Sequence, residues 1–432
     1  MVRALSTVDP ATSRPVSATA RVLAVAVLVI AGEAVFALPF HVARFFRPTL
    51  LAGLGINNTE LGALFSVYGI VAALCYFPGG LLADRFAARR LMGLALVLTG
   101  AGGLGLALLP GYRVMLVIHA GFGVTTILLF WAAMIRATRT WGAGRPGLAF
   151  GALDGGRGLF AAGLASLAAI PFRAAFTGDP VTVTADERLH ALQVVFLVYT
   201  AATFVAAALV WLVMREDPDQ QITTHRRVDW SHVRGVLAEP RIWSQALIVL
   251  AAYCAYKGID NYSLYAMLAY GLDEVEAANA VVSTAWLRPL AALGAGLLAD
   301  AIRPTRAALL GFIALVAGYC GLAFTAPGPA TTHVLWINLL VTCAAAFGLR
   351  GVYFALMDEA RIPNRMTGTA VGLISMIGFL PEIFIAPLTG WLLDRSPGLA
   401  GHHDVFMLLA GIAALGILAT VALARQSSRP CR

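Results

Sequence analysis

Charged residues are scarce in this sequence. They make up 12% of its 432 positions, whereas hydrophobic residues make up 59%. A water-soluble domain carries about 25% charged residues, so roughly half of the usual charged surface is missing. This deficit excludes an ordinary soluble protein and indicates that much of the folded surface faces lipid.

Cysteines, signal-peptide features and enzyme motifs are also few or missing. The five cysteines show no paired spacing, and we assign them no chemistry. Residues 1–20 lack a hydrophobic signal core, so we expect the first apolar run to be retained as a helix. No catalytic Ser/His set, phosphate-binding loop or metal-ligand cluster is present, and we expect neither an enzyme nor a cofactor or metal.

Long apolar runs dominate the rest of the sequence. Twelve runs of about 20 residues, the length that crosses a ~30 Å hydrocarbon core as a helix, lie between positions 21 and 424. Their length and their Leu, Ala, Gly and Val content favour helices over the short alternating strands of a membrane barrel. The sequence therefore predicts an all-α membrane protein with twelve transmembrane helices.

The two halves of the chain are related. GGLLADRFAARR at 79–90 has a counterpart in GAGLLADAIRPTR at 294–306, and Asp84 and Asp300 stand 216 residues apart, half the chain. Paired six-helix halves are typical of transporters whose substrate site lies near the bilayer midplane. We expect two pseudo-symmetric six-helix bundles. The predicted boundaries are an N-terminal tail at 1–20, a first bundle at 21–214, a linker at 215–241, a second bundle at 242–424 and a C-terminal tail at 425–432.

Basic residues are distributed unevenly between the loops. Of the 31, 21 lie in the tails and alternate loops on the side of both termini, and six lie in the opposite loops. The positive-inside rule therefore places both termini in the cytoplasm, in an inner (plasma) membrane. This bias accounts for the net charge of +8, and we expect no nucleic-acid partner.

The repeated loop resembles the signature of the major facilitator superfamily. Gly80–Arg90 is similar to the cytoplasmic loop motif of that family, Gly296–Arg306 to its second-half copy, and Gly390–Asp394 to another stretch common there. One departure is Ala87, where the family usually has glycine. The resemblance covers residues 21–424 and implies the fold of that family, with two six-helix bundles moving about a central site.

The resemblance also implies a conformational latch. Asp84 would accept hydrogen bonds from the helix start near Thr367, and Asp300 from the helix start near Gly147. The alternative is that these loops only set topology and carry a capping aspartate. The implied latch residues are Asp84, Arg85, Arg89, Arg90, Asp300, Arg303 and Arg306.

Ionisable residues inside the predicted spans are the main functional signal. Each costs ~2.5–3.5 kcal/mol at a helix centre, so they cannot all face lipid unpaired. They either pair inside the protein or line a hydrated cavity. Eight such residues are present: Glu33, Asp154, Arg157, Lys257, Asp260, Arg288, Arg350 and Glu382.

Two of these acid–base pairs are three residues apart and share a helix face. We predict a structural ion pair between Asp154 and Arg157. For Lys257 and Asp260 a structural role and a proton-handling role both remain open, because a desolvated lysine can lose its proton whereas arginine cannot. Lys257 is also the only lysine beside thirty arginines.

Arg288 is the strongest candidate for substrate binding. Its guanidinium fits a carboxylate with two parallel bonds, and Pro289 weakens the local helix. An Arg-Pro here resembles the anion-carrying branches of the family (oxalate/formate, monocarboxylate and nitrate/nitrite carriers), which implies that the arginine contacts the anion. The region of Cys75 lacks the arginine of nitrate porters, which favours an organic acid. Pairing of Arg288 with Glu382 or Asp260 is the alternative.

Further site residues follow from the spans that line the cavity in the family fold, from carboxylates inside the spans and from aromatic positions that could shape the cavity. We expect substrate binding by Arg288 with Lys257, Arg350, Tyr262 and Trp286, and proton coupling by Glu33, Asp260, Glu382 and His119. Packing roles remain open for His119 and the aromatic residues. We interpret three residues just outside the first span as interfacial anchors or as a site that attracts anions: His41, Arg44 and Arg47.

Together these features predict a secondary active transporter. Its substrate would be a small anion, an organic carboxylate, carried with protons or in exchange for another anion by a monomer in the lipid bilayer. A drug/proton exporter of the same fold is the alternative. A non-transporting membrane solute sensor is a second alternative, although the 27-residue linker leaves no room for an output domain.

Overall fold

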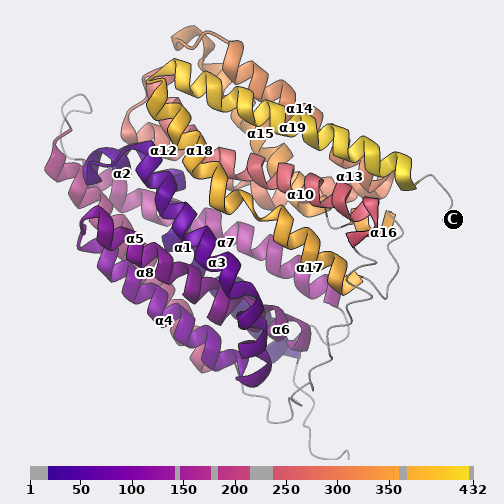
Figure 1. Cartoon of the computed structure of the whole chain (residues 1–432). Helices are drawn as coiled ribbons and strands as arrows, with labels where there is room; N and C mark the ends of the chain where they lie inside the picture. The colour runs from indigo at the N-terminus through magenta and orange to yellow at the C-terminus, as the bar shows by residue number, and fades with distance from the viewer. Residues whose placement is uncertain are drawn as a thin grey trace, which may run out of the picture.

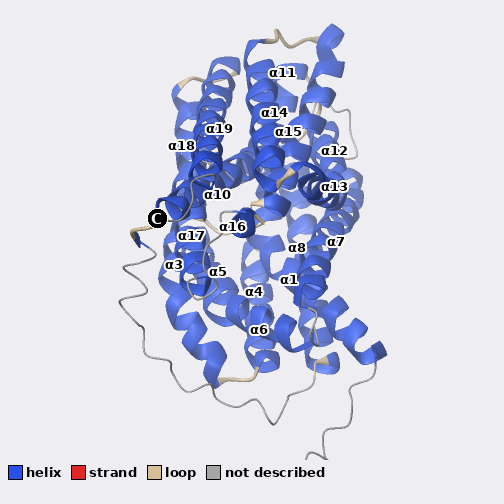
Figure 2. Ribbon diagram, turned by 90° about the vertical axis from the view of Figure 1, so that its right-hand side faces the viewer, coloured by secondary structure: helices blue, strands red, loops and turns tan. Residues whose placement is uncertain are grey.

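The chain folds as a bundle of helices. The computed structural model describes residues 18–141, 146–176, 183–214, 237–353, 355–359 and 367–427. In this part of the chain short turns join the helices and no strand is present (Figure 2). Twelve of its helical segments are long and apolar enough to cross a membrane. The predicted all-α membrane protein with twelve spans is confirmed.

The first bundle contains six spans and a short connecting helix, α2 (Arg47–Leu54). Its fourth span passes without a break through a π-helical segment, η1. The spans are α1 (Ala18–Phe45), α3 (Asn58–Arg85), α4 (Ala88–Ala107), α5–η1–α6 (Tyr112–Gly123, Val124–Trp131, Ala132–Trp141), α7 (Pro146–Ala174) and α8 (Ala185–Val213).

The second bundle repeats this arrangement with more interruptions. A four-residue helix, α16 (Leu356–Glu359), and a short 3-10 turn, η4 (Pro329–Thr331), lie between spans. The spans are α10–η3–α11 (Pro240–Gly258, Ile259–Asn261, Tyr262–Tyr270), α12–α13 (Glu274–Ala285, Leu287–Ile302), α14 (Pro304–Phe324), α15 (Thr332–Val352), α17–α18 (Thr367–Gly378, Pro381–Arg395) and α19 (Leu399–Ser427).

The two bundles lie side by side with their helices roughly parallel (Figure 1). Helices α2 and α12 lie toward one end of the molecule, which we call the α2 end. Helix α6 and the C-terminal end of α19 lie toward the opposite end, which we call the tail end (Figure 1). At the α2 end, α3, α8 and α12 each begin with a capping box, built on Asn57, Thr184 and Asp273.

Three spans of the second bundle break near their middle. Span 7 contains the 3-10 turn η3 after Gly258, span 8 breaks at Trp286 just before Pro289, and span 11 breaks just before Pro381. Proline lacks an amide N–H and clashes with the preceding turn, so it interrupts a helix and frees backbone groups. An ionisable residue lies within three positions of each break: Asp260, Arg288 and Glu382.

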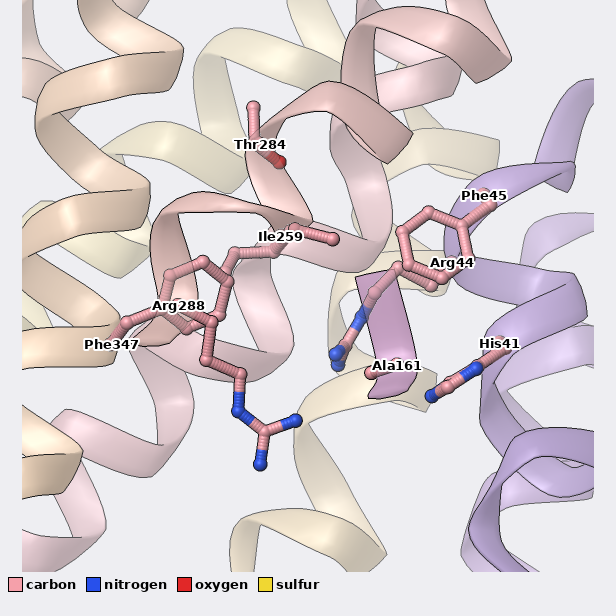
Figure 3. A pocket seen from close by; sticks show the side chains of 9 residues that line it. His41, Arg44, Phe45, Ala161, Ile259, Thr284, Arg288 and Phe347 are labelled. Carbon is pink, nitrogen blue, oxygen red and sulfur yellow. The ribbon is translucent and has the colours of Figure 1, made fainter. Parts of the chain in front are cut away.

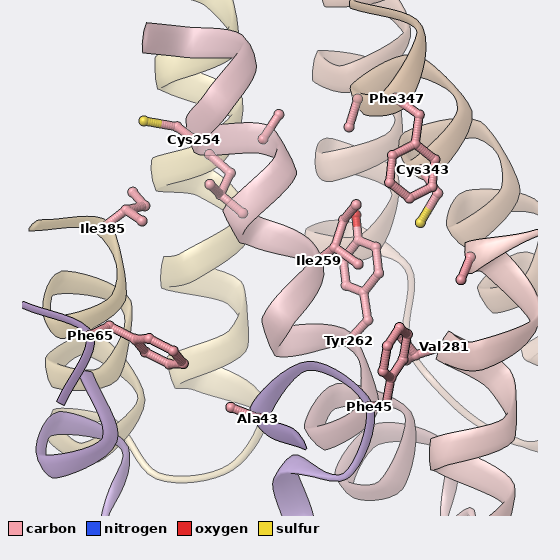
Figure 4. Packing of buried hydrophobic residues seen from close by; sticks show 14 of the residues in the cluster. Ala43, Phe45, Phe65, Cys254, Ile259, Tyr262, Val281, Cys343, Phe347 and Ile385 are labelled. Carbon is pink, nitrogen blue, oxygen red and sulfur yellow. The ribbon is translucent and has the colours of Figure 1, made fainter. Parts of the chain in front are cut away.

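The apolar core differs between the two ends. Toward the α2 end one cluster joins both bundles, with Phe45 of the first bundle beside Val281 of the second and Phe65 of the first bundle on the side of Ile385 of the second (Figure 4). Toward the tail end, the described core residues fall into separate clusters. One contains only first-bundle residues, and a small one around Ala299 contains only second-bundle residues. The bundles therefore pack together mainly at the α2 end.

Candidate functional site

Glu33 of α1 is the centre of a buried ion network between the bundles. Its side chain is 3% exposed. Arg157 of α7 donates to it through Nε at 3.0 Å, and Arg288 of α13 donates through Nη1 at 3.2 Å. His41 Nε2 lies 3.3 Å from the same carboxylate. Because Arg288 belongs to the second bundle, this network ties the two bundles together at mid-span.

A second network surrounds Lys257 of α10. Its Nζ lies 3.2 Å from Asp260 and 3.2 Å from Glu382 of α18. Asp260 also accepts from Arg44 of α1 at 2.5 Å, which adds another link between the bundles. The hydroxyl of Tyr253 donates to Glu382. Each of these carboxylates thus has a cation beside it, as burial of charge requires.

Arg350 of α15 is paired differently. Its guanidinium lies 4.2 Å from the ring centre of Tyr256 and 5.6 Å from that of Tyr253. Such stacking on aromatic rings is favourable, but it does not neutralise the charge. Among the residues that the structure describes, no carboxylate forms an ion pair with Arg350. This guanidinium therefore remains available to an anion.

Two small cavities lie between the bundles, and Arg288 lines both. The first also contains His41 and Arg44, and Figure 3 shows the nitrogen-bearing ends of these three side chains directed toward a common region. The second contains Asp154 and Arg350. The cavities thus bring together charged groups from α1, α7, α13 and α15.

The charges of the two ion networks and of the cavity linings, taken together, do not balance. Five cations, Arg44, Arg157, Lys257, Arg288 and Arg350, face four carboxylates, Glu33, Asp154, Asp260 and Glu382. With His41 neutral, the net charge of this set is +1. We call these nine side chains the central charge set. A surplus cation at membrane depth is costly, and a bound anion would remove that cost.

The predicted pairing of Asp154 with Arg157 is corrected by the structure. Arg157 turns to Glu33, and the Asp154 carboxylate lies 3.7 Å from Arg288 instead. Glu33 is the more deeply buried carboxylate, so it gains more from two cations. The pair of Lys257 with Asp260 does form, but each residue also has a partner on another helix.

The interpretation of His41, Arg44 and Arg47 as interfacial residues is also corrected. Helix α1 continues to Phe45, and the three side chains are only 4–6% exposed. Arg47 donates to the carbonyl of Asp260 and to Asn58. The sequence contained a signal that α1 continues through this region, because positions 33, 41 and 44 are spaced to lie on one face of a helix.

Three predicted site residues lie outside both cavities and both ion networks. Tyr262 is fully buried, and its hydroxyl donates to Thr342 at 2.7 Å inside the packed cluster of Figure 4. Trp286 is half-exposed and donates to Ser166 at 3.1 Å. His119 is buried between aromatic rings, with Nδ1 2.8 Å from the carbonyl of Met115. Their surroundings favour the packing role for each.

The predicted latch lies partly outside the described residues. Helices α17 and α7 begin at Thr367 and Pro146, but the side chains near these starts are not described. The contacts expected of Asp84 and Asp300 with them therefore remain predictions, as do the roles of Arg85, Arg90, Arg303 and Arg306. Arg89 lies within the first bundle, where its guanidinium is 5.1 Å from the ring centre of Trp211.

Sequence relatives of the chain are membrane proteins. The profile of the Major Facilitator Superfamily matches residues 22–386. The inner membrane protein YqcE of Escherichia coli (strain K12) is 29% identical over 380 residues, covering 84% of this chain and 85% of that protein. The hexuronate transporter of Bacillus subtilis (strain 168) is 22% identical over 400 residues, covering 88% and 89%.

Solved structures share the fold. The nucleoside transporter NupG superposes with a TM-score of 0.71 at 12% identity, over 94% of this chain and 99% of that one. A bacterial homologue of the human lysosomal transporter Spinster, in an inward-facing and occupied conformation, gives 0.69 at 15% identity, over 96% and 98%. At these identities the likeness establishes the fold.

Proposed function

The chain belongs to the Major Facilitator Superfamily, and we propose that it carries a small organic anion across the inner membrane by alternating access. It is a membrane transporter of this family, not an enzyme. The substrate class and the coupling are the parts that we propose.

The surplus positive charge of the central charge set carries this proposal. Among the described residues, Arg350 stacks on tyrosine rings and forms no ion pair with a carboxylate, and it shares a cavity with Arg288. A guanidinium stays charged under all physiological conditions and offers planar paired donors, which match a carboxylate. Binding of one monoanion would bring the net charge of the set from +1 to zero.

An organic acid is favoured over an inorganic anion. The relative from Bacillus subtilis is named a hexuronate transporter, and a hexuronate is an organic carboxylate. Apolar and aromatic groups, including Phe347 and Pro289, line the same cavity as the arginines. Such groups suit a carbon skeleton, because ligand sites combine apolar walls with a few polar anchors.

A drug/proton exporter is the second candidate function. Exporters of hydrophobic cations need a site that tolerates positive charge, and here a cationic ligand would add to a set that is already cationic. No feature of the two cavities favours that alternative. Growth of an overexpressing strain in hydrophobic cations would test it, because unaltered resistance contradicts export.

Coupling to protons or exchange for a second anion would complete the cycle. We assign proton binding to Glu382, because its cation Lys257 is shared with Asp260. Glu33 is a poorer candidate, since Arg157 and Arg288 both donate to it. Protonation of Glu382 would weaken its interactions with a shared cation and with the Tyr253 hydroxyl, whereas protonation of Glu33 would leave two guanidinium groups without their partner.

Uptake into proteoliposomes tests the proposal. With radiolabelled D-glucuronate as the probe, Arg350→Ala should reduce uptake about 10- to 100-fold, the loss expected for a hydrogen bond to a charged group. Arg113→Ala is the matched control, because Arg113 is exposed in the first turn of α5, outside the cavities, and its uptake should equal that of the wild type.

The same vesicles distinguish the coupling modes. A proton-coupled carrier responds to an imposed pH gradient, and this response should disappear in Glu382→Gln. An exchanger instead responds to glucuronate or another anion loaded inside. If Arg350→Ala transports a panel of carboxylates as fast as the wild type, the anion proposal is wrong. If neither a gradient nor an internal anion changes uptake, the coupling proposal is wrong.

A further inference from the structure

Asp154 differs from the other carboxylates of the central charge set. Its side chain is 50% exposed, whereas those of Glu33, Asp260 and Glu382 are 3–11% exposed. Its nearest cation, Arg288 Nη2, lies 3.7 Å away, which is longer than a hydrogen bond. No described residue donates a hydrogen bond to Asp154. Its carboxylate oxygens therefore keep free acceptor capacity.

The free acceptor and the free cation line one cavity. Asp154 on α7 and Arg350 on α15 both border the second cavity, which Arg288 also lines. A plain monocarboxylate would satisfy Arg350 but leave Asp154 without a donor and partly stripped of water, which costs free energy. A ligand with both a carboxylate and a hydrogen-bond donor would satisfy both groups.

The net charge of the central charge set selects between two kinds of donor. An ammonium group would give a zwitterion of no net charge and leave the surplus of +1 in place. Hydroxyl groups leave the ligand a monoanion, which cancels that surplus. The ammonium would also lie close to Arg288, which already approaches Asp154, and like charges repel at this distance. A hydroxyl donor avoids this repulsion.

We propose that the substrate is a hydroxylated carboxylate, with Asp154 accepting hydrogen bonds from its hydroxyl groups while Arg350 binds its carboxylate. This inference rests on the proposed anion-carrying function and makes Asp154 a specificity-determining residue. The carbon-bound hydrogens of such an acid would face Phe347 and Ala292, which line the same cavity.

Pairs of acids with the same number of carbons test the inference. Binding of gluconate and hexanoate, and of lactate and propionate, is measured by calorimetry on the purified full-length protein. The wild type should bind each hydroxylated acid on the order of tenfold tighter than its deoxy counterpart. In Asp154→Ala this preference should disappear, because hydroxylated acids weaken and deoxy acids do not.

A second variant identifies the donor. Asp154→Asn keeps one acceptor oxygen and removes the charge, so it should retain part of the preference for hydroxylated acids. If an amino acid such as serine binds the wild type tightly and loses binding in Asp154→Asn, the donor is an ammonium group and the inference is overturned. Thermal unfolding of each variant, with Arg113→Ala beside them, shows that the variants are folded.

The outcomes separate this inference from the function on which it rests. If the wild type binds none of the carboxylates, the anion-carrying function is contradicted. If the wild type binds both members of each pair equally, or if Asp154→Ala keeps the full hydroxyl preference, the role of Asp154 is wrong and the anion-carrying function still stands.

Discussion

The two ends of the interface between the bundles differ in how closely the helices approach. At the α2 end, a Cβ placed on Gly62 of α3 would lie 2.5 Å from the backbone of Pro387 in α18. At the tail end of the same helix, a Cβ on Gly80 would have no described atom within 4 Å. Span 11 follows the same division: its segment α18 packs on α3 of the other bundle, whereas its segment α17 packs on α10 of its own bundle.

Polar contacts follow the same division. At the α2 end Asp394 of α18 accepts hydrogen bonds from the backbone amides and side chains of Asn58 and Thr59, at 2.6–3.2 Å. It therefore caps the first turn of α3, whose amides would otherwise lack partners. The arrangement resembles the latch predicted for Asp84, but at the opposite end and with the roles of spans 2 and 11 exchanged.

This difference indicates which way the site opens. Among the described residues, the apolar core is continuous between the bundles at the α2 end and divided at the tail end. We infer that the bundles are parted at the tail end, the end that the positive-inside rule predicts to be cytoplasmic. We infer that transport requires the α2 end to part, so contacts there set how often the outward-open state forms.

A cysteine in place of Ser263 would report this opening. Ser263 lies in α11, is fully buried, and donates to the carbonyl of Arg44 in the first bundle. A membrane-impermeant thiol reagent should modify Ser263→Cys only when the bundles part at the α2 end. Three substitutions made in this background, in order of decreasing effect, test the comparison between the two ends.

Gly62→Ala should have the largest effect. Its methyl group would meet the backbone of Pro387, which cannot move aside as a flexible side chain can. Overpacking of this kind costs about 1–3 kcal/mol, so the rate of thiol modification should rise up to about 100-fold. Gly80→Ala, on the same helix, should leave the rate no higher than in the parent. Equal rates in both variants would contradict the asymmetry of the interface.

Asp394→Ala should have an intermediate effect. The substitution removes four hydrogen bonds to the first turn of α3, but Asp394 is only partly buried, so water replaces part of the loss. We expect thiol modification to rise about tenfold. The control is Asp186→Ala, an exposed acid at the same end. A rate unchanged from that control would show that Asp394 does not hold the end closed.

The sequence predicts the fold well because each span is recognisable by itself. Twelve apolar runs identify twelve helices, and the copied loop around Asp84 and Asp300 relates the halves. Local sequence also indicates the helix break at Arg288, because Pro289 follows it. In the structure Arg288 lines a cavity between the bundles at this break. Local patterns are sufficient here because a membrane helix satisfies its backbone within itself.

The ion pairs could not be predicted in the same way. Spacing within one helix indicated Asp154 with Arg157, but Glu33 on α1 takes Arg157. Arg44 lies beyond the 20-residue apolar run that predicts the first span. The helix is longer than this run, and Arg44 is buried in it with its partner Asp260, 216 positions away. Periodicity describes one helix, whereas the partner of a buried charge depends on which helices pack together.

The smallest effect is expected at Glu274, the first residue of α12. It accepts from Arg188 of α8 at 2.5 Å and from the hydroxyl of Thr49 in α2, and thus joins the bundles at the rim of the α2 end. Because Arg188 is 29% exposed, the ion pair contributes only about 0.5–1 kcal/mol. Glu274→Gln should therefore raise modification of Ser263→Cys about threefold. Added salt screens exposed ion pairs, so it should reduce the difference in modification rate between Glu274→Gln and its parent. If that difference persists in 1 M salt, the effect comes from the buried contact with Thr49 and not from the ion pair.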